Sequence, residues 1–105
     1  MSGISTHVLD TSAGRPAAGI RVRLFRGEQE IASEVTNSDG RCPALLPHDV
    51  AFEEDIYRIV FEIEREFPHG FYPEIAISFR VSDASAHYHV PLLLSPFGYT
   101  TYRGS

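Results

Sequence analysis

Apolar and polar positions alternate along most of the chain, and clusters of turn-forming residues interrupt the alternation at regular intervals. Between residues 20 and 25, Ile20, Val22 and Leu24 alternate with two arginines, which places the three apolar side chains on one face of an extended strand. Short strands of this kind, separated by turns every eight to twelve residues, are typical of an all-β sandwich. The pattern therefore predicts an all-β fold of about eight strands.

The expected strands cover residues 4–9, 20–25, 31–36, a short piece that begins at residue 41, and residues 56–63, 75–81, 87–95 and 99–102. The piece at residue 41 can form only a brief edge strand, because Pro43 and Pro47 cannot donate hydrogen bonds to a ladder. We expect a loop over residues 10–19. One short helix is expected within residues 64–69, where Pro68 and Gly70 would end it.

The length and composition favour one ordinary globular domain over residues 1–105. The chain has 105 residues, of which 43% are hydrophobic and 22% are charged, and it shows no internal repeat or low-complexity tract. Its formal net charge of −5 provides no general attraction to nucleic acid or to an anionic membrane surface. We therefore expect neither as a partner, and a small anionic ligand would need locally placed positive charge.

The cellular location is predicted from cysteine content and from the lack of targeting signals. Cys42 is the only cysteine, so no disulfide can form within the chain and the fold must depend on its apolar core. No apolar run approaches the length of a transmembrane helix, and the first residues lack the basic and apolar parts of a secretory signal. We expect a soluble, cytoplasmic protein.

The histidines permit three interpretations. His87 and His89 lie two positions apart on an expected strand, so both rings project from the same face, as they do in zinc sites; a third ligand such as His7 would be needed. Acid–base catalysis is the second interpretation, because imidazole exchanges protons near neutral pH. The third is that each histidine is an ordinary polar residue of a strand. His48 and His69 lie in expected loops and are interpreted as surface residues.

Arg41 directly follows the turn Asn37-Ser-Asp-Gly40, where a rigid backbone can direct its guanidinium at an anion; the alternative is a solvated arginine at a sheet edge. Cys42 is a candidate nucleophile, although a free cysteine usually behaves as a small apolar residue.

The end of the chain, Tyr99-Thr-Thr-Tyr-Arg-Gly-Ser105, can line a pocket for a flat polar heterocycle, or it can be a solvated terminus.

Four stretches together resemble the 5-hydroxyisourate hydrolases, which are relatives of transthyretin. They are Ser5-Thr-His-Val-Leu-Asp10 with Gly14-Arg-Pro-Ala-Ala-Gly19, Asn37-Ser-Asp-Gly-Arg-Cys42, His87-Tyr-His-Val-Pro-Leu-Leu-Leu-Ser-Pro96 and Tyr102-Arg-Gly-Ser105. The first two are typical of many prealbumin-like sandwiches. The last two are more specific, and the resemblance covers nearly the whole chain.

The resemblance implies a prealbumin-like two-sheet β-sandwich, a single transthyretin-like hydrolase domain, and a homotetramer with active sites where two dimers meet. It also implies a set of polar site residues, which falls on His7, Arg41, His89, Tyr102, Arg103 and Ser105. Transthyretin itself lacks the histidine pair, the arginine and the Tyr-Arg-Gly-Ser ending. Residues 62–75 are shorter than is usual in the family, so the shape of this segment is not implied.

The implied activity is a step of urate degradation in purine metabolism. Water opens the six-membered ring of 5-hydroxyisourate at a cyclic amide C–N bond, which yields 2-oxo-4-hydroxy-4-carboxy-5-ureidoimidazoline, without a metal or organic cofactor. One histidine of the pair His7 and His89 would be the general base. Arg41, with Arg103, would hold the substrate anion and stabilise the developing oxyanion.

Tyr102 and Ser105 would fix the substrate ring by hydrogen bonds, with Ser105 counted among the catalytic residues. Two alternatives remain open at this stage. The first is a non-catalytic prealbumin-like module that binds or carries a small molecule. The second is a zinc hydrolase built on the histidines.

Overall fold

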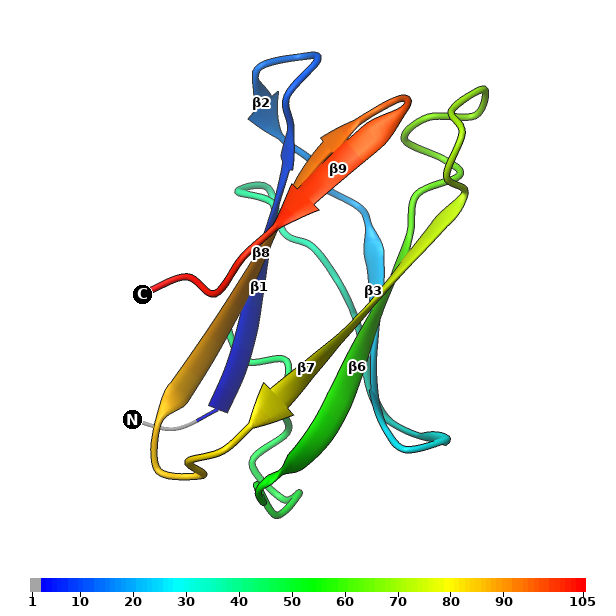
Figure 1. Cartoon of the computed structure of the whole chain (residues 1–105). Coiled ribbons are helices and arrows are strands. Elements are labelled where there is room, and N and C mark those ends of the chain that lie inside the picture. Colours follow the sequence, from blue (N-terminus) through cyan, green and yellow to red (C-terminus); the bar gives the residue numbers. More distant parts are fainter. Residues whose placement is uncertain (1–2) are drawn as a thin grey trace.

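The computed structural model describes residues 3–105, and these residues form strands, turns and loops (Figure 1). The strands are β1 (Gly3–Asp10), β2 (Arg15–Pro16), β3 (Arg21–Arg26), β4 (Gln29–Val35), β5 (Arg41–Cys42), β6 (Asp55–Glu62), β7 (Glu74–Val81), β8 (His87–Ser95) and β9 (Gly98–Thr101). Each of the eight expected strands is present. The ninth, β2, is a two-residue strand inside the segment that was expected to be only a loop.

The first sheet joins the two ends of the chain. Its strand order is β2-β1-β8-β9, and β5 pairs with the part of β1 that β2 leaves free. The pairing of β1 with β8 is parallel and runs over eight residue pairs, from Gly3 opposite His87 to Asp10 opposite Leu94. Histidines near the start of the chain and near its end therefore lie on neighbouring strands.

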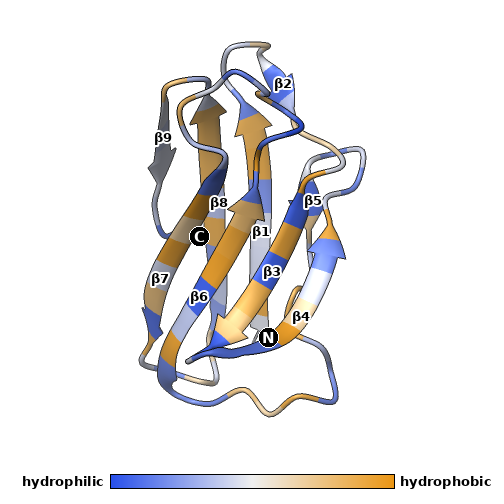
Figure 2. Cartoon of the chain, turned by 90° about the vertical axis from the view of Figure 1, so that its right-hand side faces the viewer, coloured by the Kyte–Doolittle hydropathy of each residue, from blue (hydrophilic) through white to orange (hydrophobic). Residues whose placement is uncertain are grey.

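The second sheet is antiparallel throughout, with the order β4-β3-β6-β7. Apolar and polar bands alternate along β3 and β6 in the view onto this sheet (Figure 2). Within the described residues, β7 is an edge strand of this sheet and β9 is an edge strand of the first. The alternation read from the sequence thus corresponds to one buried and one outward face.

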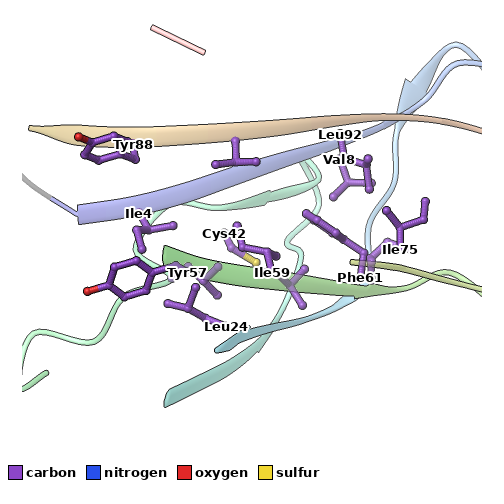
Figure 3. Close-up of a cluster of buried hydrophobic side chains, with 14 of the residues drawn as sticks. Ile4, Val8, Leu24, Cys42, Tyr57, Ile59, Phe61, Ile75, Tyr88 and Leu92 are labelled. Atoms are coloured by element: carbon purple, nitrogen blue, oxygen red, sulfur yellow. The ribbon is translucent and has the colours of Figure 1, made fainter. Parts of the chain in front are cut away.

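The core fills the space between the two sheets (Figure 3). Ile4, Val8 and Leu92 reach into it from the first sheet, and Tyr57 and Phe61 reach into it from the second; each is at most 1% exposed. Full burial of side chains of this size stabilises a fold by about 1.5–3 kcal/mol each. Because even-numbered residues of β1 and β8 supply this core, their odd-numbered residues face outward.

The expectation of one short helix was wrong. Residues 64–69 form turns in which the N–H groups of Glu66 and Phe67 both donate to the carbonyl of Ile63, and the helical turn ends there. Pro68 cannot donate the next helical hydrogen bond, and the chain then bends so that the N–H of Gly70 donates to the carbonyl of Phe67. Across residues 3–105, no helix is long and apolar enough to cross a membrane.

Candidate active site

The outward face of the first sheet carries three of the five histidines. His7 comes from β1, and His87 and His89 come from β8, all at odd-numbered and half-buried positions. Ser5 lies directly opposite His89 in the parallel pairing of the two strands. Because residues two apart on a strand share a face, these side chains occupy one side of the sheet.

A tight turn places Arg41 beside them. The side-chain oxygen of Asn37 accepts hydrogen bonds from the backbone N–H groups of Asp39 (2.9 Å) and Arg41 (3.0 Å), which fixes the loop from inside. Gly40 has a φ of 74° and lies against β1, where its carbonyl accepts a 2.7 Å hydrogen bond from the N–H of Val8. The turn therefore delivers Arg41 to a position directly opposite His7.

The last residues of the chain return to β8. After β9 the chain runs back along the first sheet (Figure 1), and the N–H of Gly104 donates a 2.8 Å hydrogen bond to the carbonyl of His89. This contact brings the chain end, Ser105, to the side of the histidines. Residues separated by a hundred positions along the chain thus become neighbours.

These elements border an open-sided cavity of about 210 Å³. Its lining residues come from β1, β5, β8, the chain end and the residue after β5: Ser5, Thr6, Arg41, Pro43, His87, His89 and Ser105. Three of the predicted site residues, Arg41, His89 and Ser105, therefore line one cavity. Its walls offer a cation, imidazole groups and hydroxyl groups to a small polar anion.

The electrostatic environment favours the neutral form of His89. Burial lowers the pKa of His89 below its ordinary value of 6.5, and electrostatic repulsion from Arg41, His7 and His87 lowers it further, against a hydrogen bond to the backbone of Ser5 that raises it. His7 does not line the cavity, yet it lies close enough to affect the pKa of His89. A neutral imidazole can accept or donate a hydrogen bond at neutral pH.

Tyr102 and Arg103 lie elsewhere. They line a second hollow of about 270 Å³ together with residues of β7, β8 and β9. The guanidinium carbon of Arg103 lies 4.3 Å from the ring centroid of Tyr88, within the range of a cation–π interaction. Within one chain, these two residues are therefore separated from the cavity that Arg41, His89 and Ser105 share.

The sequence assigned no role to Ser5 or Gly104, and the polar set that the resemblance implies omits His87. Ser5 lies between the two imidazoles of β8, with its hydroxyl oxygen 2.7 Å from Nε2 of His87 and 2.8 Å from Nδ1 of His89. The sequence pattern makes His87, together with His89, a candidate zinc ligand or acid–base group, but the family resemblance does not include it in the polar set. Gly104 had no assigned role, although a larger residue there would collide with the ring of His89. The alternation of apolar and polar residues places Ser5 on the same face of the strand as His7. Only the pairing of β1 with β8 shows that the hydrogen-bond partners of Ser5 are His87 and His89.

The other candidates lie apart from this chemistry. Cys42 is 1% exposed in the core, and burial raises the pKa of its thiol to about 11, so its reactive thiolate is disfavoured. His48 and His69 are exposed, as expected. Within residues 3–105, no group of three or more His, Cys, Asp and Glu side chains is arranged to hold a metal ion.

Residues 4–104 match the model of the HIUase/Transthyretin family. The chain belongs to this family.

Individual members of the HIUase/Transthyretin family are similar over nearly their whole length. The 5-hydroxyisourate hydrolase of Mus musculus is 43% identical over 115 residues, which cover 99% of this chain and 96% of the mouse protein. The structure of Klebsiella pneumoniae 5-hydroxyisourate hydrolase superposes with a TM-score of 0.89 at 34% identity, with both chains covered completely.

The transthyretin branch of the family shares the fold. Sea bream transthyretin, whose structure was solved in complex with thyroxine, superposes with a TM-score of 0.88 at 25% identity, over 96% of this chain and 93% of the other. The prealbumin-like sandwich expected from the sequence is thereby confirmed. Both branches of the family act on or bind small molecules, so a small-molecule ligand is the common expectation for its members.

Proposed function

We propose that this chain is a 5-hydroxyisourate hydrolase of urate degradation. The observation that carries the proposal is the convergence of Arg41, His89 and Ser105 on one small polar cavity. The similarity to 5-hydroxyisourate hydrolases at 34–43% identity over the whole chain supports the same activity. The substrate is a flat, polar heterocycle of a size that such a cavity can hold.

The reaction needs a base, a polarised carbonyl and a protonated leaving nitrogen. A histidine of the pair His7 and His89 takes a proton from water, whose oxygen attacks the ring carbonyl; a positioned base of this kind contributes about 10²–10⁴-fold. The cationic Arg41 holds the substrate anion and stabilises the negative charge that develops on the carbonyl oxygen. The C–N bond then breaks, the nitrogen receives the proton, and the product carries a new carboxylate.

The chain end completes the site in this proposal. Ser105 donates a hydrogen bond from its hydroxyl to the substrate ring within the cavity. Tyr102 and Arg103 contribute to substrate binding at a cavity formed between copies of the chain, because in one copy they line a different hollow. No metal or organic cofactor is part of this mechanism.

We further propose a homotetramer with its active sites where two dimers meet. Edge strands β7 and β9 border the hollow that contains Tyr102 and Arg103, and a second copy can continue both sheets by pairing with these edges. Sedimentation analysis should give four times the chain mass of 11.7 kDa. A monomer at enzyme-assay concentrations would contradict the assembly. A cytoplasmic location stays a prediction from the sequence.

The direct test follows the absorbance of freshly made 5-hydroxyisourate. Decay should be faster with the wild-type protein than in buffer, and His89→Ala should remove most of the acceleration. His69→Gln is the matched control, because His69 is exposed and lies outside the cavity, and this variant should match the wild type. Equal decay with wild type and with buffer would refute the proposed function.

A deletion tests the role of the chain end. Removal of Arg103 to Ser105 should abolish turnover while the thermal unfolding transition persists, because these residues follow the last strand and the core does not include them. Full activity of the shortened chain would contradict a role of the tail.

The carrier alternative makes a different prediction. A carrier would bind a heterocycle stoichiometrically without turnover, and alanine at Arg41 or His89 would barely alter its affinity. Metal analysis, with activity measured before and after chelation, separates a zinc hydrolase from the proposed mechanism.

A further inference from the structure

Ser5 couples the two histidines of β8. Its hydroxyl oxygen lies within hydrogen-bond distance of Nε2 of His87 (2.7 Å) and of Nδ1 of His89 (2.8 Å), and Ser5 is only 7% exposed. A hydroxyl has a single proton to donate. When both hydrogen bonds are made, one imidazole nitrogen accepts the Ser5 proton and the other donates its own N–H to the Ser5 oxygen. The protonated nitrogen of one ring therefore determines that of the other.

The surroundings of His87 select one of the two arrangements. Nδ1 of His87 is buried and has no hydrogen-bond partner among residues 3–105, and a Cβ atom at Gly3 would lie only 3.6 Å from it. A buried N–H group without an acceptor is among the rarest features of folded proteins. A proton on Nδ1 is thereby disfavoured, so the proton of neutral His87 lies on Nε2 and is donated to Ser5.

The same logic continues to His89. Since Ser5 receives a hydrogen bond from His87, it donates its own proton to Nδ1 of His89. Neutral His89 then carries its proton on Nε2, the nitrogen that makes no hydrogen bond to the described part of the chain. His89 lines the cavity, so this N–H is available to the ligand.

We infer that Ser5 and His87 are positioning residues that hold His89 in the Nε2–H tautomer, so that His89 presents a hydrogen-bond donor to the substrate. This inference rests on the proposed function for its catalytic meaning. A neutral imidazole with its proton on the free nitrogen stabilises a developing oxyanion but cannot accept a proton from water there. The role of general base then belongs to His7, which makes no such contact with Ser5.

The first experiment reads the tautomer without any turnover. Nitrogen-15 NMR of protein labelled in histidine distinguishes a protonated from an unprotonated ring nitrogen, and His87→Gln and His89→Gln assign the signals. Nε2 of His89 should be protonated and Nδ1 unprotonated. A proton on Nδ1 of His89 would overturn the inference, whatever the outcome of the 5-hydroxyisourate assay.

Two variants test the coupling itself. Ser5→Ala removes the bridge, so the His89 signals should shift toward a mixture of tautomers and kcat should fall by about tenfold with KM little changed. His87→Gln keeps a donor near Nε2 and should retain the wild-type tautomer of His89. Ser95→Ala is the matched control, because it removes a serine hydroxyl from the outward face of the same sheet, on β8 and outside the cavity. Unchanged His89 signals in Ser5→Ala would contradict the coupling.

A third comparison separates donor from base. Glutamine can imitate the Nε2–H of an imidazole but cannot act as a base at neutral pH. His89→Gln should therefore retain more activity than His89→Ala, while His7→Gln should lose about 10²–10⁴-fold. The opposite order, with His7→Gln the more active variant, would contradict the assignment. Absence of turnover by the wild type would refute the proposed function and leave the NMR result on the tautomer in place.

Discussion

A Cβ atom at Gly104 would lie 2.5 Å from Cδ2 of His89, a distance that real Cβ contacts do not show. The backbone of Gly104 is held at this distance by its hydrogen bond to the carbonyl of His89. Only glycine leaves room for the imidazole between the tail and β8. The His89 ring can occupy its position because Gly104, which packs against it, has no side chain.

The substitution Gly104→Ala should therefore displace the His89 ring or detach the tail. Either change moves a side chain of the proposed active site, and a misplacement of about 1 Å can lower the rate about 10²-fold. The global stability should change little, because the tail lies outside the core. Steady-state kinetics with 5-hydroxyisourate and thermal unfolding measure the two effects.

Gly98→Ala is the control for this prediction. Gly98 also lies in the C-terminal part of the chain, but a Cβ atom there meets nothing closer than the Ser95 hydroxyl at 3.7 Å. This variant should retain wild-type activity. If both variants were equally active, close packing of Gly104 against His89 would have no role in the site.

A second prediction concerns the turn that delivers Arg41. Gly40 has a φ of 74°, and a Cβ atom there would lie 2.4 Å from the backbone oxygen of Val8. Gly40→Ala should therefore destabilise the fold by about 3 kcal/mol or more, since backbone on both sides must move. Gly14 has a similar φ of 70° with open space around it, so Gly14→Ala should cost only about 1–2 kcal/mol. Urea unfolding of the two variants provides the comparison, and equal losses would contradict the argument.

A third prediction follows from the lowered pKa of His89. Burial and the nearby charges of Arg41, His7 and His87 hold this pKa below the ordinary 6.5 of the unfolded chain. As the pH falls below 6.5, the unfolded chain binds a proton at this position before the folded chain does, so the folded state loses stability. The contribution of neutral His89 to the stability of the folded state is fully present above pH 6.5, and it is lost as the pH falls through the lowered pKa of His89 in the folded state.

The measurement compares wild type with His89→Gln in urea unfolding between pH 5 and 8. As the pH decreases below 6.5, the free energy of unfolding of the wild type should decrease relative to that of His89→Gln, because glutamine does not titrate. In Arg41→Gln, the NMR titration of His89 should show a higher pKa than in wild type, since a neighbouring positive charge is removed. A His89 pKa at or above 6.5 in the wild type would show that the sign is wrong.

A fourth prediction tests the interpretation of Cys42. Its thiol is 1% exposed and its pKa is raised to about 11 by burial, so the folded protein should resist iodoacetamide at neutral pH. Cys42→Ala should keep full activity and lose about 1 kcal/mol of stability through the small volume removed from the core. A large loss of kcat in a folded Cys42→Ala protein would support the nucleophile interpretation.

Much of the fold could be predicted because strand periodicity is a local property. Ile20, Val22 and Leu24 alternate with polar residues, and each is at most 2% exposed in the structure. The short helix at residues 64–69 was predicted wrongly, because the local signal of one turn does not determine whether a helix continues past it. The strand β2 was missed because two residues carry no periodicity.

The sequence by itself determined eight of the nine strands, the turn before Arg41 and the face from which His7, His87 and His89 project, since these follow from backbone geometry over a few residues. Only the tertiary structure decided that Ser5 lies between two histidines and that Gly104 packs on His89. The first contact depends on the pairing of β1 with β8, and the second depends on the return of the chain end to β8. Pairing between such distant segments is selected by burial of the whole core rather than by neighbouring residues.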